Sequence, residues 1–311
     1  MVKSTNLVVW VILLSVFASP PVSGWAKEGP IVIVKSRDIE AFERARLGFE
    51  AILKSKKPAY TLITKSLEGK KDNSLVALFE EIRSEQPAMV LTIGLTSTLA
   101  ARERMHEFPV LFTMVLDPER DGLAPPGVTI KLSMREKLHL LRRLLPNAAR
   151  MGIVYSPNSE DVWKEALEEG RQEGFGVVAV KIESGEMLPA AFESIAPKID
   201  LMMMVADAVL YAPKTVEALL LASMKHRVPV VGLSSSYSKA GALVSLEYDQ
   251  EDSGRVAGEM ALRVLEGSDP ASLGYEHPSK ILYTLNAEVA KRMGIHFPDD
   301  MLKGAEEVFG R

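Results

Sequence analysis

The sequence predicts an α/β protein with two Rossmann-like lobes, each containing a parallel sheet covered by helices on both faces. Short apolar runs alternate with amphipathic segments of helical length along the chain after residue 26. The same order of segments begins twice. The runs at 31–34 and 110–115 are almost continuously apolar, as strands buried on both faces are. Strands that alternate with helices in this way are typical of parallel sheets.

The first half of the chain contains four expected strands and three expected helices. We expect strands at 31–34, 60–64, 88–93 and 109–114, and helices at 39–53, 75–84 and 96–105. In the first of these helices Phe42, Ala45, Phe49 and Ile52 recur every three or four residues, which is the helical period.

The second half repeats this order. We expect strands at 151–155, 177–182, 200–206 and 228–232, and helices at 160–173, 190–196 and 214–225. Ser36 corresponds to Ser156, and Pro109 corresponds to Pro229, both at one offset of 120 residues. A repeat in register predicts two β/α units of one design in tandem.

The remaining segments are expected to connect the two lobes. A loop at 118–127 leads into a first crossing and then into a helix at 135–145 that ends before Pro146. The run 242–246 is interpreted as a strand returning to the first lobe, followed by a helix at 252–265 and a strand at 280–285. The expected boundaries are 27–130 plus 246–278 for lobe one, and 131–245 plus 279–311 for lobe two.

The first 26 residues have the order of a secretory signal peptide. Lys3 precedes twelve residues, 7–18, that are apolar except for one Ser, and small residues follow two prolines. Cleavage is expected after Gly24 or Ala26. A run of twelve residues is short for a membrane span, which needs about 20, although an uncleaved anchor is the alternative.

The amino-acid composition limits the expected cellular location of the protein and the kinds of partner it can bind. The formal charge is −4, acidic and basic residues are interleaved, and the chain has no cysteine. We therefore expect no nucleic-acid surface, no disulfide and no lipid anchor. An exported protein without an anchor would diffuse away from a cell lacking an outer membrane, so we expect a periplasmic location.

Catalytic and cofactor motifs are not found. The five histidines are far apart in the sequence, without metal-ligand spacing. The run from Gly232 to Ser236 begins like a nucleophile elbow but has Ser where the closing Gly belongs. There is no phosphate-binding loop and no dinucleotide-binding turn. We expect neither an enzyme nor a cofactor, although a periplasmic enzyme on this fold is a further alternative.

Binding is expected at the carboxyl ends of the strands, where loops lead into helix N-termini. Such termini present free backbone N–H groups that hold carboxylates and other oxygens. Two facing sheets would surround one cleft with six such loops. The candidate ligand-binding residues on these loops are Ser36, Arg37, Thr96, Ser97, Asp117, Tyr155, Ser156, Asn158, Asp207, Ser234 and Ser235.

Six of these residues also have a structural interpretation. Thr96 or Ser97 is suited to cap a helix, as are Ser156 and Ser234. Asp207 follows an apolar strand, so its carboxylate either receives a ligand amine or hydroxyl, or caps a helix or completes a turn. For Arg37 the alternatives are a bidentate contact with a ligand carboxylate and a solvated loop position.

Long ordered segments resemble one family of periplasmic substrate-binding proteins of ABC transporters, which includes tryptophan- and phenylalanine-type binders. The segments are FPVLFTMVLDP (108–118), LLRRLLPNAARMGIVYSPN (140–158), the run from RVPVVGLSSSYSKAG to VLEG (227–267), and KILYTLNAEVAKRMGIHFPDDMLKGA (280–305). The similarity extends from about residue 31 to residue 309.

The resemblance implies the type I periplasmic binding fold, with three crossings in its hinge. It implies a small polar ligand, such as an amino acid, and an ABC permease and ATPase as partners. It also implies ligand contacts at most of the loop residues named above. The segments KSRDIE (35–40) and VADAVLYAP (205–213) depart from commoner members at the expected pocket, which puts an aromatic ligand in doubt. A sensor that docks on a receptor kinase or chemoreceptor is the alternative function.

Overall fold

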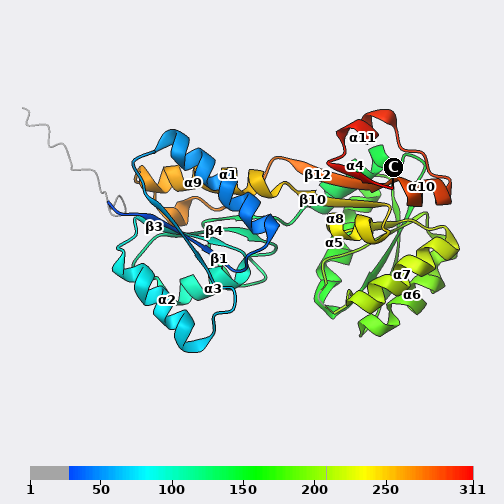
Figure 1. Ribbon diagram of the computed structural model, residues 1–311. Helices are drawn as coiled ribbons and strands as arrows, with labels where there is room; N and C mark the ends of the chain where they lie inside the picture. Colours follow the sequence, from blue (N-terminus) through cyan, green and yellow to red (C-terminus); the bar gives the residue numbers. More distant parts are fainter. Residues whose placement is uncertain (1–27, 208, 311) are drawn as a thin grey trace, which may run out of the picture.

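The computed structural model describes residues 28–207 and 209–310, which form two α/β lobes lying side by side (Figure 1). The expected signal peptide, residues 1–26, lies outside the described residues. In the described part of the chain, no helix has the length and apolar character needed to span a bilayer.

The first lobe contains a six-stranded sheet with the order β11-β5-β4-β3-β1-β2, in which every neighbouring pair is parallel. Its strands are β1 (Ile31–Lys35), β2 (Leu62–Ser66), β3 (Met89–Ile93), β4 (Val110–Val115), β5 (Gly127–Thr129) and β11 (Tyr275–Glu276). Its helices are α1 (Glu40–Lys56), α2 (Asp72–Ser84), α3 (Leu95–Arg104) and α9 (Gln250–Leu265).

The second lobe contains a seven-stranded sheet with the order β13-β12-β10-β9-β8-β6-β7, parallel except between β10 and β12. Its strands are β6 (Arg150–Tyr155), β7 (Gly176–Lys181), β8 (Leu201–Met203), β9 (Val230–Gly232), β10 (Val244–Tyr248), β12 (Ile281–Asn286) and β13 (Glu307–Phe309). Its helices are α4 (Met134–Leu144), α5 (Glu160–Gln172), α6 (Leu188–Ile195), α7 (Pro213–His226), α8 (Ser235–Ala240), α10 (Ala287–Met293) and α11 (Asp299–Gly304), and a short 3-10 helix, η1 (Pro157–Ser159), precedes α5.

The internal repeat is confirmed by the strand order. The first five strands are arranged 5-4-3-1-2, and the next five, β6 to β10, have the corresponding order 10-9-8-6-7. Ser36 and Ser156 each directly follow the strand that opens their lobe. The offset of 120 residues therefore relates equivalent positions in two copies of one topology.

The position of β10 corrects one expectation. The strand covers Val244–Tyr248 and pairs with β9 and β12 in the second sheet, so the predicted return of 242–246 to the first lobe is wrong. Leu246 and Tyr248 are buried in the core of the second lobe, which accounts for the strand reaching two residues further along the chain than expected. The second crossing therefore lies at Asp249, immediately before α9.

Helix α9 packs against α1 at unusually close range. A Cβ atom on Gly254 would lie 1.8 Å from the carbonyl oxygen of Ala45, and one on Gly48 would lie 2.0 Å from that of Glu251. Only glycine permits this approach of two backbones. The contact fixes α9, and with it the second crossing, against the first lobe.

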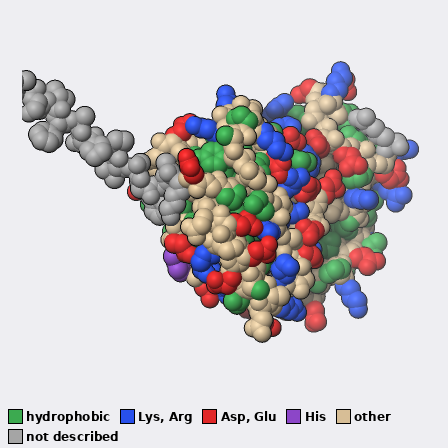
Figure 2. Space-filling view, turned by 60° about the vertical axis from the view of Figure 1, so that its left-hand side comes forward, with side chains coloured by type: hydrophobic (Ala, Val, Ile, Leu, Met, Phe, Trp, Pro, Cys, Tyr) green, Lys and Arg blue, Asp and Glu red, His purple; other side chains and the backbone are tan. Residues whose placement is uncertain are grey.

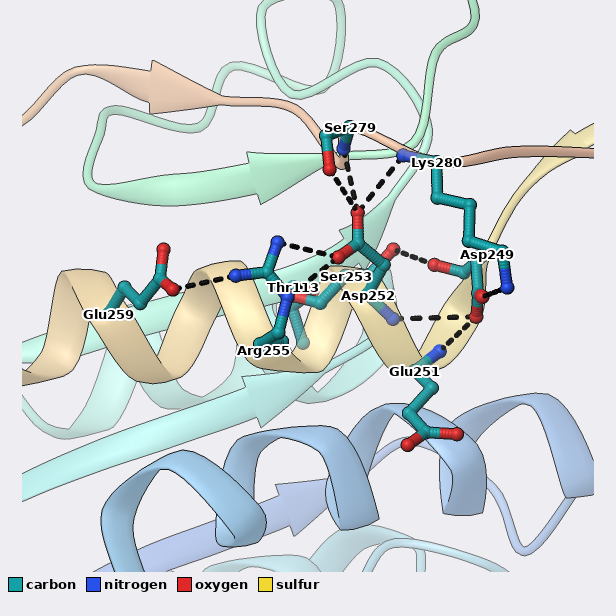
Figure 3. Close-up of polar contacts among 9 residues, drawn as sticks. All are labelled: Thr113, Asp249, Glu251, Asp252, Ser253, Arg255, Glu259, Ser279 and Lys280. Carbon is teal, nitrogen blue, oxygen red and sulfur yellow. Dashed lines mark hydrogen bonds and ion pairs between the residues drawn. The ribbon is translucent and has the colours of Figure 1, made fainter. Parts of the chain in front are cut away.

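The second and third crossings are joined by hydrogen bonds (Figure 3). The carboxylate of Asp252 accepts from the backbone N–H of Ser279 at 2.7 Å and from that of Lys280 at 3.1 Å. Asp249 caps α9 and accepts from the Lys280 ammonium group at 2.8 Å. The two connections therefore form one unit next to the first lobe, while the first crossing, at 130–133, is separate.

Charged side chains of both signs are interspersed over the face shown in Figure 2. This distribution agrees with the interleaving of acidic and basic residues in the sequence. It places no large area of a single sign on that face.

Candidate functional site

The loops after β1 and β3 meet through a pair of serines. The Ser36 hydroxyl donates to the Ser97 hydroxyl at 3.0 Å and accepts from the Ser97 backbone N–H at 2.8 Å. Both residues are buried. The structure thus brings together two predicted residues from separate loops. Both hydrogen bonds between them involve uncharged groups only.

Helix α3 begins one residue earlier than expected, and neither Thr96 nor Ser97 is its N-cap. Gly94 takes that position with φ +92°, a conformation that favours glycine. The Ser97 N–H, which a capping side chain would normally satisfy, is satisfied by Ser36 instead. Thr96 is exposed, and within the described residues its hydroxyl has no hydrogen-bond partner.

The loops after β6 and β8 meet through a carboxylate. Asp207 is 8% exposed, and its Oδ2 accepts from the hydroxyls of Ser156 and Ser159, both at 2.6 Å. Its Oδ1 accepts from the Val209 backbone N–H at 2.9 Å. The Val209 contact is the one that the turn alternative predicts, whereas the two serine contacts join separate loops and were not predicted. A ligand contact to Asp207 stays a prediction.

The environment of Asp207 keeps it charged. Burial acts to raise the pKa of this carboxyl, but the hydrogen bonds from Ser156, Ser159 and Val209 outweigh it and hold the pKa below its ordinary value. A buried carboxylate with three donors is a strong constraint on loop conformation. The Ser156 hydroxyl, which donates to Asp207, also accepts from the Asn158 backbone N–H at 3.1 Å. The Asp207 carboxylate therefore helps to order the loop after β6 through Ser156.

The helix that follows β9, α8, is capped by a side chain from the neighbouring strand β10. Ser234 occupies the N-cap position of α8, but its hydroxyl pairs with that of Ser236 at 2.8 Å. The Ser235 backbone N–H donates instead to Glu247 on β10, at 3.0 Å. Burial raises the pKa of Glu247 despite this hydrogen bond.

A hollow of about 500 Å³ lies between the lobes at the ends of β4 and β6. It is lined by Asp117, Glu119, Arg120, Lys131, Pro157, Asn158 and Asp161. Asp117 accepts from the Lys131 ammonium group at 2.7 Å. A larger hollow, of about 880 Å³, is lined only by second-lobe residues such as Leu221 and Val289, so the lobes cannot close on it. The smaller hollow is the candidate ligand site.

The other predicted residues differ in their surroundings. Tyr155 is half-buried, and its ring stacks on Trp163 with centroids 5.5 Å apart. Arg37 is exposed, and among the described residues its side chain forms no hydrogen bond or ion pair. The structure therefore unites Ser36 with Ser97, and Ser156 with Asp207, while Arg37 stands apart.

Sequence reasoning missed several residues of these loops. They are Ser159, Glu247, Glu119, Arg120, Lys131 and Asp161. The Pro-Asn-Ser run after Ser156 was a usable signal for Ser159, because serine near a helix start often accepts or donates to the backbone. Nothing local predicts Glu247 as a cap, since its partner lies on a different element.

No group of three or more histidine, aspartate or glutamate side chains is placed to hold a metal ion in residues 28–207 and 209–310. The chemical capacity of the loops is therefore that of hydroxyls, amides, a few charges and helix N-termini. Such groups bind polar ligands through hydrogen bonds.

Comparison with known proteins agrees with this arrangement. A tyrosine-binding protein of Clostridioides difficile is 22% identical over 254 residues, which are 78% of this chain and 68% of that protein. A ligand-free, open substrate-binding protein with adhesive properties from Clostridium difficile has a TM-score of 0.78 at 20% identity, covering 91% of this chain and all of that one. An ABC domain from Streptococcus pneumonia in complex with L-Trp has a TM-score of 0.63 at 19% identity, with the same coverage.

The fold, with two repeated lobes and three crossings, is the type I periplasmic binding fold, as expected from the sequence. The model of the family described as ABC transporter substrate binding protein matches residues 39–309. The match includes both lobes and all three crossings. The chain therefore belongs to the ABC transporter substrate-binding protein family.

Proposed function

We propose that this protein binds an amino-acid-like ligand between its lobes and delivers it to an ABC importer. The observation that carries the proposal is the hollow of about 500 Å³ lined from both lobes at the carboxyl ends of parallel strands. The relatives named for tyrosine and L-Trp support the ligand class. The family supports the importer.

The proposed contacts come from the six loops at the strand ends. They are Ser36, Thr96, Ser97, Asp117, Tyr155, Ser156, Asn158, Asp207, Ser234 and Ser235. Arg37, which is exposed, is assigned its other expected role, a solvated loop position. Among the proposed contacts Thr96 and Asn158 are exposed and Ser234 is half-buried, so a ligand can reach all three. Asp207 is assigned a positioning role, because its hydrogen bonds order the loop that carries Asn158.

The proposed setting is the periplasm, reached by export through a cleaved signal peptide. A permease and an ATPase are the proposed partners. Amino-terminal sequencing of periplasmic material should begin near Trp25 or Lys27. Recovery only in a membrane fraction, beginning at Met1, would reject the exported soluble form.

The ligand is tested by a thermal-shift screen of the twenty amino acids and small polar metabolites, with mass spectrometry of any molecule that co-purifies. A ligand at about 100 times its Kd adds about 2.7 kcal/mol to stability, so at least one clear shift is expected. A variant with Thr96, Asn158 and Ser234 all changed to Ala should lose that shift. An equal shift in the variant places binding elsewhere.

A further inference from the structure

The hollow between the lobes is lined by charged side chains of both signs. Some of them are paired with each other within the protein and others are not. Asp117 and Lys131 form an ion pair at 2.7 Å. Glu119, Arg120 and Asp161 are exposed, and in the described part of the chain their side chains form no hydrogen bond or ion pair. Asn158 adds an exposed amide. Among the described residues that line it, the hollow therefore offers one free cation and two free anions.

Arg120 is presented by an ordered turn. The Asp121 N–H donates to the Asp117 carbonyl at 3.1 Å, and the Leu123 N–H donates to the Pro118 carbonyl at 2.8 Å. The Arg120 N–H itself donates to the Asp117 carboxylate at 3.2 Å. Because the backbone is fixed at three points, binding needs to order only the side chain of Arg120.

The free groups belong to opposite lobes. Arg120 lies in the loop after β4 of the first lobe, and Asp161 lies in the first turn of α5 in the second. A guanidinium can hold a carboxylate through two parallel hydrogen bonds. A ligand with a carboxylate and an ammonium group would join the two residues and link the lobes.

Building on the proposed function, we propose that Arg120 binds the carboxylate of the ligand and that Asp161, across the hollow, accepts its ammonium group. Arg37, also exposed at a strand end of the first lobe, does not line the hollow. Asp207, the other candidate for the ammonium group, already accepts three internal hydrogen bonds. Specificity for a zwitterion would thus reside on the hinge side of the cleft.

The test compares Arg120→Gln with Arg37→Gln. Isothermal calorimetry is carried out with the amino acid that gives the largest thermal shift, and with its primary amide. We expect Arg120→Gln to weaken the amino acid at least about tenfold, as loss of a charged hydrogen bond implies, with the melting temperature of the empty protein unchanged. Arg37→Gln should leave the affinity unchanged.

The primary amide of the ligand tests whether Arg120 contacts the ligand carboxylate directly or whether Arg120→Gln changes the cleft in a general way. Amidation removes the carboxylate charge, so it should weaken binding to the wild type about tenfold and to Arg120→Gln far less. If Arg37→Gln causes the larger loss, or Arg120→Gln still discriminates fully against the amide, the assignment of Arg120 is wrong while the proposed function stands. If no amino acid binds the wild type, both the amino-acid ligand and this assignment are rejected.

Asp161 is tested with the analogue that lacks the amino group. Asp161→Asn should weaken the amino acid about tenfold and leave the deaminated analogue unaffected. Asp207→Asn serves as the comparison. If Asp207→Asn, and not Asp161→Asn, abolishes the preference for the amine, the ammonium site lies at Asp207 and the assignment of Asp161 is overturned.

Discussion

Ser36 and Ser156 occupy equivalent positions in the two lobes, yet they are held by different chemistry. Ser36 shares two hydrogen bonds with Ser97, at 2.8 and 3.0 Å, and both partners are neutral. Ser156 donates to the carboxylate of Asp207 at 2.6 Å. In each lobe the contact joins the loop after the first strand to the loop after the third in the repeated order.

The two lobes therefore have a loop-to-loop contact at the same position, but the hydrogen bonds that form it differ in strength. Hydrogen bonds to a charged group are worth about 1.5–3 kcal/mol, against about 0.5–1.5 kcal/mol for neutral ones. The binding face of the second lobe should therefore be more tightly ordered at neutral pH. It should also be the one that responds to acid.

The largest effect is expected from Asp207→Asn. The amide has the size of the carboxylate, but it is neutral and keeps only one acceptor oxygen where the carboxylate accepts three hydrogen bonds with two. We expect a loss of about 3 kcal/mol in the free energy of unfolding of the second lobe. In a chain beginning at Lys27, Trp163 is the single tryptophan, so its fluorescence during denaturation reports on that lobe.

Hydrogen exchange of β1 and β3 supplies the control for the first lobe, where protection should be unchanged. The ligand alternative for Asp207 predicts the reverse pattern, with stability retained and affinity lost. That pattern would remove the proposed positioning role.

The penalty of Asp207→Asn should depend on pH. Because the folded-state pKa of Asp207 lies below its ordinary value, the stabilisation is present above the unfolded pKa, about 3.9, and is lost as the pH falls through the folded value. The difference between wild type and variant should therefore shrink from about pH 5 to about pH 3. Chemical denaturation at pH 7, 5 and 3 measures it, and a constant difference would show that the charge is not responsible.

Sequence reasoning predicted the repeat and the equivalence of Ser36 and Ser156, because the apolar periodicity and the constant offset can be read directly from the chain. It did not predict Gly94 as the cap of α3, since the N–H of Ser97 is satisfied by a residue 61 positions away. It placed the strand of β10 at 242–246 and did not identify Glu247 as part of it or as the acceptor at the start of α8. Contacts between elements decide such positions.

A smaller effect is expected from Ser156→Ala. Asp207 would keep Ser159 and the Val209 N–H but lose one charged hydrogen bond, which costs about 1.5–3 kcal/mol. Like the Asp207 penalty, this cost should diminish in acid. Denaturation monitored at Trp163 measures it, and combining Ser156→Ala with Asp207→Asn tests the coupling. Fully additive losses would mean that the two residues act independently.

The smallest effect is expected from Ser36→Ala in the first lobe. The Ser97 hydroxyl also donates to the carbonyl oxygens of Ile93 and Gly94, both at 3.1 Å, so it keeps acceptors when Ser36 is removed. The Ser97 N–H alone loses its partner. We expect a loss of about 0.5–1.5 kcal/mol, with no change between pH 7 and pH 3 because neither group titrates in that range. Hydrogen exchange of β1 and β3 measures this loss within the first lobe. A cost for Ser36→Ala equal to that of Ser156→Ala at pH 7 would show that the Asp207 charge gives the second lobe no advantage.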